Sequence, residues 1–170
     1  MILKICDPSR KCLSHSFKLF QHYKSNTFIE EMSGNYYFVI IGHQDNPIYE
    51  QEHSSRDSQN KKDDYRDLCQ FVAHASLDMI DEHMWTTNNM YLKIVDKFND
   101  WNVSAFVTAG KQRFIILHDV KNEDSIRQFF QEVYELYIKV AMNPFYEPNT
   151  PITSQVFHQK LKVLCRRYLI

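Results

Sequence analysis

Residues 91–119, YLKIVDKFNDWNVSAFVTAGKQRFIILHD, form the most regular pattern in this chain of 170 residues. The stretch contains three runs rich in β-branched and aromatic residues, at 91–98, 101–110 and 113–119. Such residues favour β-strands. The runs meet at Asn99-Asp100 and at Gly110–Gln112, and connections this short are typical of hairpins. The stretch therefore predicts a meander of three antiparallel strands.

The side chains of this meander predict cover on both faces of the sheet. Alternate residues of a strand share a face. One face of the middle strand carries Trp101, Val103, Ala105 and Val107, whereas Phe106 lies on the other. Both alternating sets of the third strand are apolar, namely Phe114 with Ile116 and Ile115 with Leu117. A strand that is apolar on both sides indicates that helices or other elements pack against both faces.

Two more strands are expected before the meander. Residues 35–42, NYYFVIIG, form a short apolar run that ends at Gly42. The Asx residues and the proline of 43–47 favour a turn, and Ile48–Glu52 forms a second, weaker strand. The two strands form a predicted hairpin. The polar residues 53–63, HSSRDSQNKKD, then predict a solvated loop.

Asp64–Trp85 is the first predicted helix, and it carries two apolar sets. Leu68, Phe71, Val72, Ala75 and Met79 follow helical spacing and form one stripe. A narrower second set consists of Ala73, Leu77, Ile80 and Met84. Two sets suggest a helix packed by its own sheet on one side and by a partner on the other; the alternative is one wide core face. Asp78 falls at the edge of the stripe. It is either a solvated residue at the rim or an acid that pairs with a basic residue of a partner.

The C-terminal third predicts two further helices. Asn122 can cap a helix over Asn122–Met142, with Glu123 and Asp124 in its first turn. The segment MNPFYEPNTPI, residues 142–152, ends that helix, and another begins between Thr150 and Thr153 and continues to Tyr168. Phe145 and Tyr146 in this loop either plug the space between the two helices or present an aromatic contact to a partner.

The element order β-β-α-β-β-β-α-α predicts the α+β class, with a five-stranded antiparallel sheet between helices. The charge excludes a general nucleic-acid surface, because 20 basic and 21 acidic residues give a net charge of −1. Only 3 glycines are present, which argues against a glycine-rich phosphate cradle. We expect no transmembrane segment, because no run reaches about 18 apolar residues.

Enzyme chemistry is not predicted either. His74, Asp78 and Glu82 are spaced to share a helix face and could hold a metal, but a solvated polar face is the favoured interpretation. Cys69 and His74 are five residues apart and do not lie over one another. Cys165 precedes two arginines, which could lower its pKa. We expect no catalytic residues, no metal and no cofactor.

Three segments resemble the sedlin family of small subunits of the transport protein particle (TRAPP) complex. They are MSGNYYFVIIGHQDNPIYE (32–50), FVAHASLDMIDEHMWTTNNMYLKIVDKFNDWNVSAFVTAGKQRFIILHD (71–119) and MNPFYEPNTPI (142–152). The resemblance extends from Met32 to the C-terminus. It implies a longin-like (SNARE-like) sandwich over 32–170, preceded by a poorly ordered extension over 1–31.

The resemblance also implies a function. The chain would be a non-catalytic subunit of the TRAPP vesicle-tethering complex in endoplasmic reticulum to Golgi transport. Its partners would be other TRAPP subunits and, indirectly, a Rab GTPase, and it would lie in the cytoplasm, the perinuclear region and the endoplasmic reticulum–Golgi region, with peripheral membrane association through the complex. The alternative is a regulatory adaptor that binds transcription factors or channel proteins outside the complex, with a nuclear pool.

The expected partner contacts come from two segments. Asp78 lies in LDMIDE (77–82) and resembles the family's partner-facing acid. The full set is Asp78, Leu77, Ile80 and Met84 on the first helix, with Phe145 and Tyr146 in the loop.

Overall fold

The computed structural model describes residues 35–53 and 59–170. The predicted extension over 1–31 and its boundary with 32–170 lie outside the described residues. The described elements, in chain order, are β1 (Tyr36–Ile41), β2 (Pro47–His53), α2 (Gln59–Ala75), α3 (Leu77–Thr86), β3 (Tyr91–Phe98), β4 (Trp101–Val107), β5 (Arg113–His118), α4 (Glu123–Ala141) and α5 (Gln155–Tyr168). No helix in this part of the chain is long and apolar enough to cross a membrane.

The five strands form one sheet in the order β2-β1-β5-β4-β3. Every neighbouring pair is antiparallel. The N-terminal hairpin joins the meander through β1 and β5, where Tyr36 lies opposite His118 and Ile40 opposite Phe114. The predicted hairpin, the predicted meander and the α+β class are confirmed.

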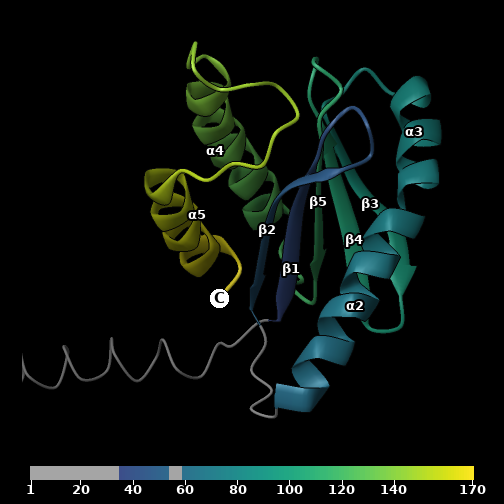
Figure 1. The fold of residues 1–170 in the computed structure, drawn as a ribbon. Helices are drawn as coiled ribbons and strands as arrows, with labels where there is room; N and C mark the ends of the chain where they lie inside the picture. The colour runs from purple at the N-terminus through teal and green to yellow at the C-terminus, as the bar shows by residue number, and fades with distance from the viewer. Residues whose placement is uncertain (1–34, 54–58) are drawn as a thin grey trace, which may run out of the picture. The chain divides into compact units, whose positions relative to one another are not determined.

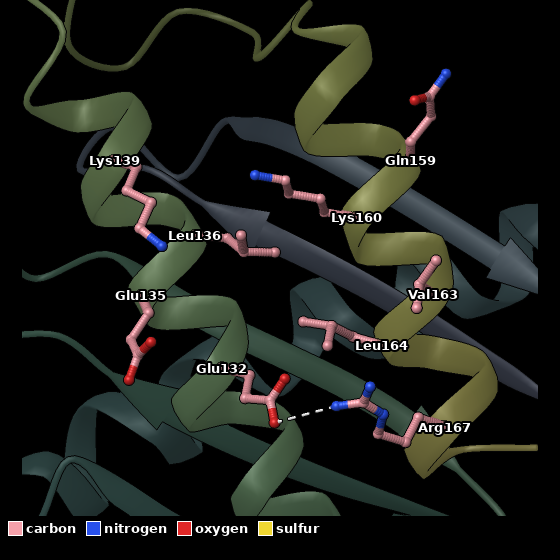
Figure 2. Close-up of a pocket in the computed structure, with 9 residues that line it drawn as sticks. All are labelled: Glu132, Glu135, Leu136, Lys139, Gln159, Lys160, Val163, Leu164 and Arg167. Atoms are coloured by element: carbon pink, nitrogen blue, oxygen red, sulfur yellow. Dashed lines mark ion pairs between the residues drawn. The ribbon is translucent and has the colours of Figure 1, made fainter.

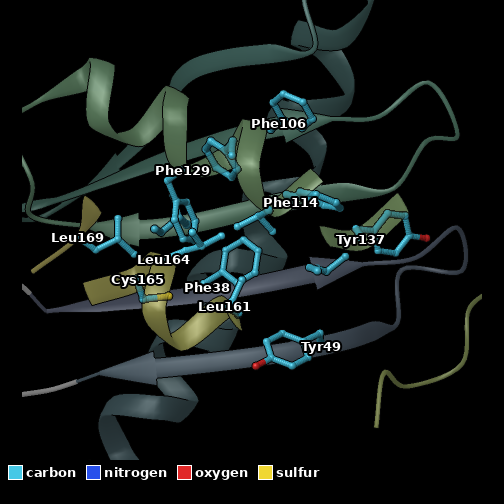
Figure 3. Close-up of a cluster of buried hydrophobic side chains, with 14 of the residues drawn as sticks. Phe38, Tyr49, Phe106, Phe114, Phe129, Tyr137, Leu161, Leu164, Cys165 and Leu169 are labelled. Carbon is cyan, nitrogen blue, oxygen red and sulfur yellow. The ribbon is translucent and has the colours of Figure 1, made fainter. Parts of the chain in front are cut away.

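Helices cover both faces of the sheet, as Figure 1 shows: α4 and α5 lie on one side, and α2 and α3 on the other. The α4–α5 side encloses what we call the aromatic core. Its large rings are Tyr36, Phe38, Tyr49, Phe106, Phe114, Phe129, Phe130, Tyr137 and Phe157, and several of them are drawn in Figure 3. Phe38 meets Phe129 edge to face, with 5.3 Å between ring centroids and 88° between planes, a favourable arrangement for aromatic pairs.

The α2–α3 side encloses what we call the aliphatic core. It contains Tyr37, Val39, Ile41, Cys69, Val72, Ala73, Leu77, Ile80, Leu92, Val95, Val103, Ala105, Val107, Ile115 and Leu117. Strand residues alternate between the two cores, so that Ile115 and Leu117 face α2–α3 while Phe114 and Ile116 face α4–α5. Cover on both faces, predicted from the pattern of β5, is confirmed.

The single helix predicted over Asp64–Trp85 is wrong, because the segment forms two helices that meet at Ser76. The Ser76 hydroxyl is buried and donates a 2.8 Å hydrogen bond to the carbonyl of Ala73. A serine that bonds back to the preceding turn competes with the helical hydrogen bonds and bends the chain. The loop predicted over 53–63 is also too long, since α2 begins at Gln59.

The C-terminal helices are close to the prediction. Asn122 caps α4, and its side-chain oxygen accepts from the backbone N–H groups of Asp124 and Ser125 at 3.1 and 3.4 Å. The last helix begins later than predicted, at Gln155, because the Ser154 hydroxyl caps it by accepting from the N–H of Phe157. A serine at this position ends the preceding loop and fixes the first helical turn.

Candidate functional site

The outward face of α2–α3 exposes a continuous apolar stripe. Leu68, Phe71, Ala75 and Met79 follow at spacings of three, four and four, and all four are exposed. Phe71 is the most prominent, with 69% of its surface accessible. Clustered exposed apolar side chains are typical of protein–protein contacts rather than of an isolated surface.

Two carboxylates continue this stripe along α3. Asp78 follows Ala75 by three residues and Glu82 follows Asp78 by four, so that helical spacing puts them on the same side as Phe71. Both are exposed. No ion pair involves either of them among the residues that the structure describes. The outward face therefore combines apolar area with free negative charge, which suits a partner that supplies a cation.

Leu77 and Ile80 point the other way. Leu77 is 5% exposed and Ile80 is fully buried, both within the aliphatic core. The two apolar sets of the sequence thus have opposite roles to those expected: the narrower set faces the sheet, and most of the broader stripe faces solvent. Leu77 and Ile80 therefore offer almost no accessible surface to a partner. We expect the partner contacts of this helical layer to come from the exposed stripe instead.

A buried arginine holds α3 against one end of the sheet. Arg113, the first residue of β5, reaches the Asp81 carboxylate, with both oxygens 3.3 Å from its Nη1. Its Nη2 donates to the carbonyl of Gly42 at 3.1 Å and to Asp45. Arg113, Asp45 and Asp81 line a hollow of about 310 Å³. The half-buried Met84 and the exposed Trp85 line it as well. Arg113 thereby fixes α3 relative to the turn between β1 and β2.

The loop between α4 and α5 is anchored to the other side of that turn. Asn149, which has a positive φ of 65°, accepts from the N–H of His43 at 3.1 Å, and its carbonyl accepts from the Asn46 side chain at 3.0 Å. The N–H of Ile152 donates to the carbonyl of Ile48 at 2.9 Å. A Cβ atom on Gly42 would come within 2.6 Å of the Asn149 side-chain oxygen. This glycine therefore permits the close approach of the loop.

Phe145 and Tyr146 of this loop differ in burial, so the plug interpretation and the partner-contact interpretation apply to different residues. Tyr146 is half-buried against the aromatic core, and its hydroxyl donates to the carbonyl of Thr150 at 2.8 Å. Phe145 is 94% exposed, although the loop that carries it is hydrogen-bonded on both sides. Tyr146 fits the plug interpretation, whereas the exposure of Phe145 is compatible with a partner contact, which stays a prediction.

The side chains singled out for chemistry are poorly placed for it. Burial raises the pKa of the Cys69 thiol to about 11 and that of the Cys165 thiol to about 12, so both are unreactive near neutral pH. For Cys165 this is opposite to the lowering that its neighbouring arginines suggested. His74 is exposed and does not join Cys69 in the core. Within the described residues, no group of three or more histidine, cysteine or acidic side chains is arranged to hold a metal.

The six predicted contact residues do not form one patch. Asp78 and Met84 belong to the α2–α3 layer, whereas Phe145 and Tyr146 belong to the loop of the opposite layer. The sequence reasoning missed Arg113, which ties the α3 layer to the β1–β2 turn. The available signal was a cation at the start of an otherwise apolar strand, since such a residue needs a partner when it is buried.

Comparison with known proteins agrees with this fold. A family model described as Sedlin matches residues 40–167. The "Probable trafficking protein particle complex subunit 2" of Drosophila melanogaster is 55% identical over 135 residues, which cover 79% of this chain and 97% of that protein. The protein of the same name from Caenorhabditis elegans is 52% identical, over 79% of this chain and 96% of its own length.

A fungal relative is less identical, but the similarity covers a comparable share of both chains. The "Transport protein particle 20 kDa subunit" of Schizosaccharomyces pombe is 45% identical over 133 residues, which cover 78% of this chain and 98% of that protein. The longin-like sandwich expected from the resemblance is thus supported by both the strand order and the family match. The chain belongs to the sedlin family.

Proposed function

We propose that this chain is a subunit of a trafficking protein particle complex and contributes protein–protein contacts, without a catalytic step of its own. The observation that carries the proposal is the extent of the similarity. It covers 97% and 96% of the length of two relatives that are named as such subunits. The complex acts in transport from the endoplasmic reticulum to the Golgi, on the cytoplasmic side of these membranes. The chain meets a Rab GTPase only through neighbouring subunits.

The surface of the chain supports an assembly role. The exposed stripe of α2–α3 offers Phe71 and Met79 as apolar anchors next to the carboxylate of Asp78, which forms no ion pair with any residue that the structure describes. Interfaces of this kind obtain most of their binding energy from a few buried aromatic or charged residues. Asp78 is the sharpest single probe, because a partner's cation would lose its ion pair when the carboxylate is removed.

The test is the Asp78→Tyr variant of the full chain, tagged and expressed in cells. We expect the wild-type chain to be recovered with other subunits of the trafficking particle in one large species, measured by size-exclusion chromatography and mass spectrometry. The variant should recover these subunits at least about tenfold less, because a buried charge pair contributes several kcal/mol when one partner is lost. Its melting temperature should stay unchanged, since Asp78 is exposed.

Asp100→Tyr is the matched control, because Asp100 is also an exposed aspartate but lies in the β3–β4 turn. It should leave recovery of the particle intact. A large drop in the melting temperature of Asp78→Tyr would instead make Asp78 a structural residue. A wild-type chain that runs as a lone small species would contradict the proposed function itself.

A further inference from the structure

A groove of about 570 Å³ runs between α4 and α5 on the side of these helices away from the sheet. Figure 2 shows the side chains that line it. Both helices direct their large apolar residues at the sheet, among them Phe129 and Val133 of α4 and Phe157 and Leu161 of α5. The groove lies between the sides of the two helices that face away from the sheet. It is distinct from the α2–α3 stripe, which belongs to the opposite layer.

The floor of the groove is aliphatic. Leu136 of α4 and Leu164 of α5 point into the space between the helices in Figure 2, and Val163 of α5 also lines the groove. Val163 keeps 55% of its surface exposed, and Leu136 is half-buried. An aliphatic side chain laid on this floor would remove apolar surface from water on both partners, at about 25 cal/mol per Å².

Three basic residues and two glutamates line the groove, which leaves an excess of one positive charge, and Glu135 lies one helical turn before Lys139 on α4. Glu132 already accepts from the hydroxyl of Tyr168 at 2.6 Å and pairs with Arg167 at 3.7 Å. In Figure 2, Lys160 extends from α5 into the space between the helices, whereas Lys139 runs down along α4. Neither lysine has an ion-pair partner in the part of the chain that the structure describes. The two ammonium groups outnumber the one carboxylate near them, that of Glu135, so this end of the apolar floor favours a further carboxylate beside aliphatic side chains.

The backbone around the groove selects a helical occupant. The walls are α4 and α5, whose backbone groups bond within their own helices, and the edge strands of the sheet are β2 and β3. An extended peptide would find no strand edge here to satisfy its N–H and C=O groups. A helix satisfies its own backbone and presents side chains one turn apart to the groove.

We propose that the α4–α5 groove binds an amphipathic, acidic helix of a partner protein. Aliphatic side chains of that helix contact Leu136, Val163 and Leu164, and a carboxylate one turn away lies between Lys139 and Lys160. The occupant is a separate protein rather than a second copy of this chain, because a contact between two different faces of identical chains would build a ring or an open filament of this chain alone. The inference does not depend on the assembly role of the α2–α3 stripe.

The test selects helical peptides, from a phage-displayed library randomised on one helix face, against the full 170-residue chain. We expect enriched peptides to carry Asp or Glu one turn from Leu or Ile. Their affinity, measured by fluorescence anisotropy with synthetic peptides, should fall at least about tenfold for the double variant Lys139→Glu with Lys160→Glu. Val163→Asp should weaken binding independently, through the floor.

The matched control is Lys97→Glu with Lys162→Glu, which makes the same change of net charge at exposed lysines outside the groove. It should leave peptide affinity within about twofold, and the melting temperatures of both double variants should match the wild type, because all four lysines are exposed. Asp78→Tyr should bind the peptides normally, which separates this inference from the proposed function.

Three results would overturn the proposal. One is the absence of selected binders, and another is a set of binders that shows no acidic enrichment or binds both double variants equally. The third is concentration-dependent self-association of the wild-type chain that the groove variant abolishes, which would assign the groove to a second copy.

Discussion

The two helical layers of this domain differ in where they place their large side chains. On the α4–α5 side, the rings of Phe38, Phe114 and Phe129 are fully buried. On the α2–α3 side, the helices contribute small and aliphatic residues to the core, such as Ala73, Cys69 and Ile80. Two large aromatic side chains of these helices, Phe71 and Trp85, are exposed instead. The two faces of the sheet, one largely aromatic and one largely aliphatic, are therefore covered by layers of unlike character.

This difference separates stability from recognition within one fold. Buried aromatic rings remove the most apolar area from water per residue, so the aromatic core should carry most of the stability that single substitutions can test. The α2–α3 layer keeps apolar area exposed, which lowers the solubility of the isolated chain but offers a partner a ready contact. The predictions below are arranged from the largest expected effect to the smallest.

Phe129→Ala should have the largest effect on stability. Phe129 is fully buried and meets both Phe38 and Phe130, at 5.3 and 5.8 Å between ring centroids. Removal of a buried ring loses its transfer free energy and leaves a cavity, so the free energy of unfolding should fall by about 3–5 kcal/mol. Urea denaturation of the variant and the wild type measures this loss.

Phe145→Ala is the matched control for the same truncation in an exposed position. Because Phe145 is 94% exposed, its removal should change the free energy of unfolding by less than about 0.5 kcal/mol. Equal losses for the two variants would contradict the assignment of stability to the aromatic core.

A buried histidine makes the aromatic side of the sheet sensitive to acid. The ring of His118 shares a buried hydrogen-bonded pair with Ser104, at 3.0 Å from Nε2. The carbonyl of Val120 lies 3.1 Å from Nδ1, so Nδ1 carries the proton and Nε2 accepts from the hydroxyl. Burial lowers the pKa of His118 below its ordinary value of 6.5. The folded protein therefore favours the neutral ring.

We expect stability to decrease as the pH falls below about 6.5. The unfolded chain then binds a proton that the folded chain resists, and the loss stops growing once the pH is below the folded pKa. The slope from one histidine cannot exceed about 1.4 kcal/mol per pH unit. Urea denaturation between pH 7.5 and 5 should show a smaller pH dependence for His118→Gln than for the wild type. Identical pH dependence would remove His118 as the cause.

Most of the fold could be predicted from local patterns. Strand alternation in 101–107 and 113–118 fixed which side chains face which layer, because the side-chain period of a strand is two and admits only two answers. Asn122 marked the start of α4 for a similarly local reason, since an Asn side chain satisfies the first free N–H groups of a helix. The break at Ser76 was missed, because serine also occurs within straight helices and its burial depends on the sheet.

The orientation of α2–α3 could not be predicted, because both apolar sets fit the helical period. What decides between them is distance: Cys69, Ala73 and Ser76 are small, and small side chains allow a helix to approach a sheet closely. Only the set that includes these neighbours, with Leu77 and Ile80, can face the sheet at that distance. The α4–α5 groove was equally hidden, since it depends on the relative placement of two helices.

Phe71→Ser should have as small an effect on stability as Phe145→Ala, but a large effect on binding. Phe71 is 69% exposed on the α2–α3 stripe, so the free energy of unfolding should change by less than about 0.5 kcal/mol. If the stripe is an assembly surface, loss of an aromatic anchor should reduce recovery of other complex subunits by about tenfold or more, which corresponds to at least about 1.4 kcal/mol.

Val156→Ser is the control, because Val156 is an exposed apolar residue on α5, in the opposite layer. A stripe used for assembly predicts that only Phe71→Ser reduces recovery, whereas a similar reduction in both variants would trace the effect to general surface hydrophobicity.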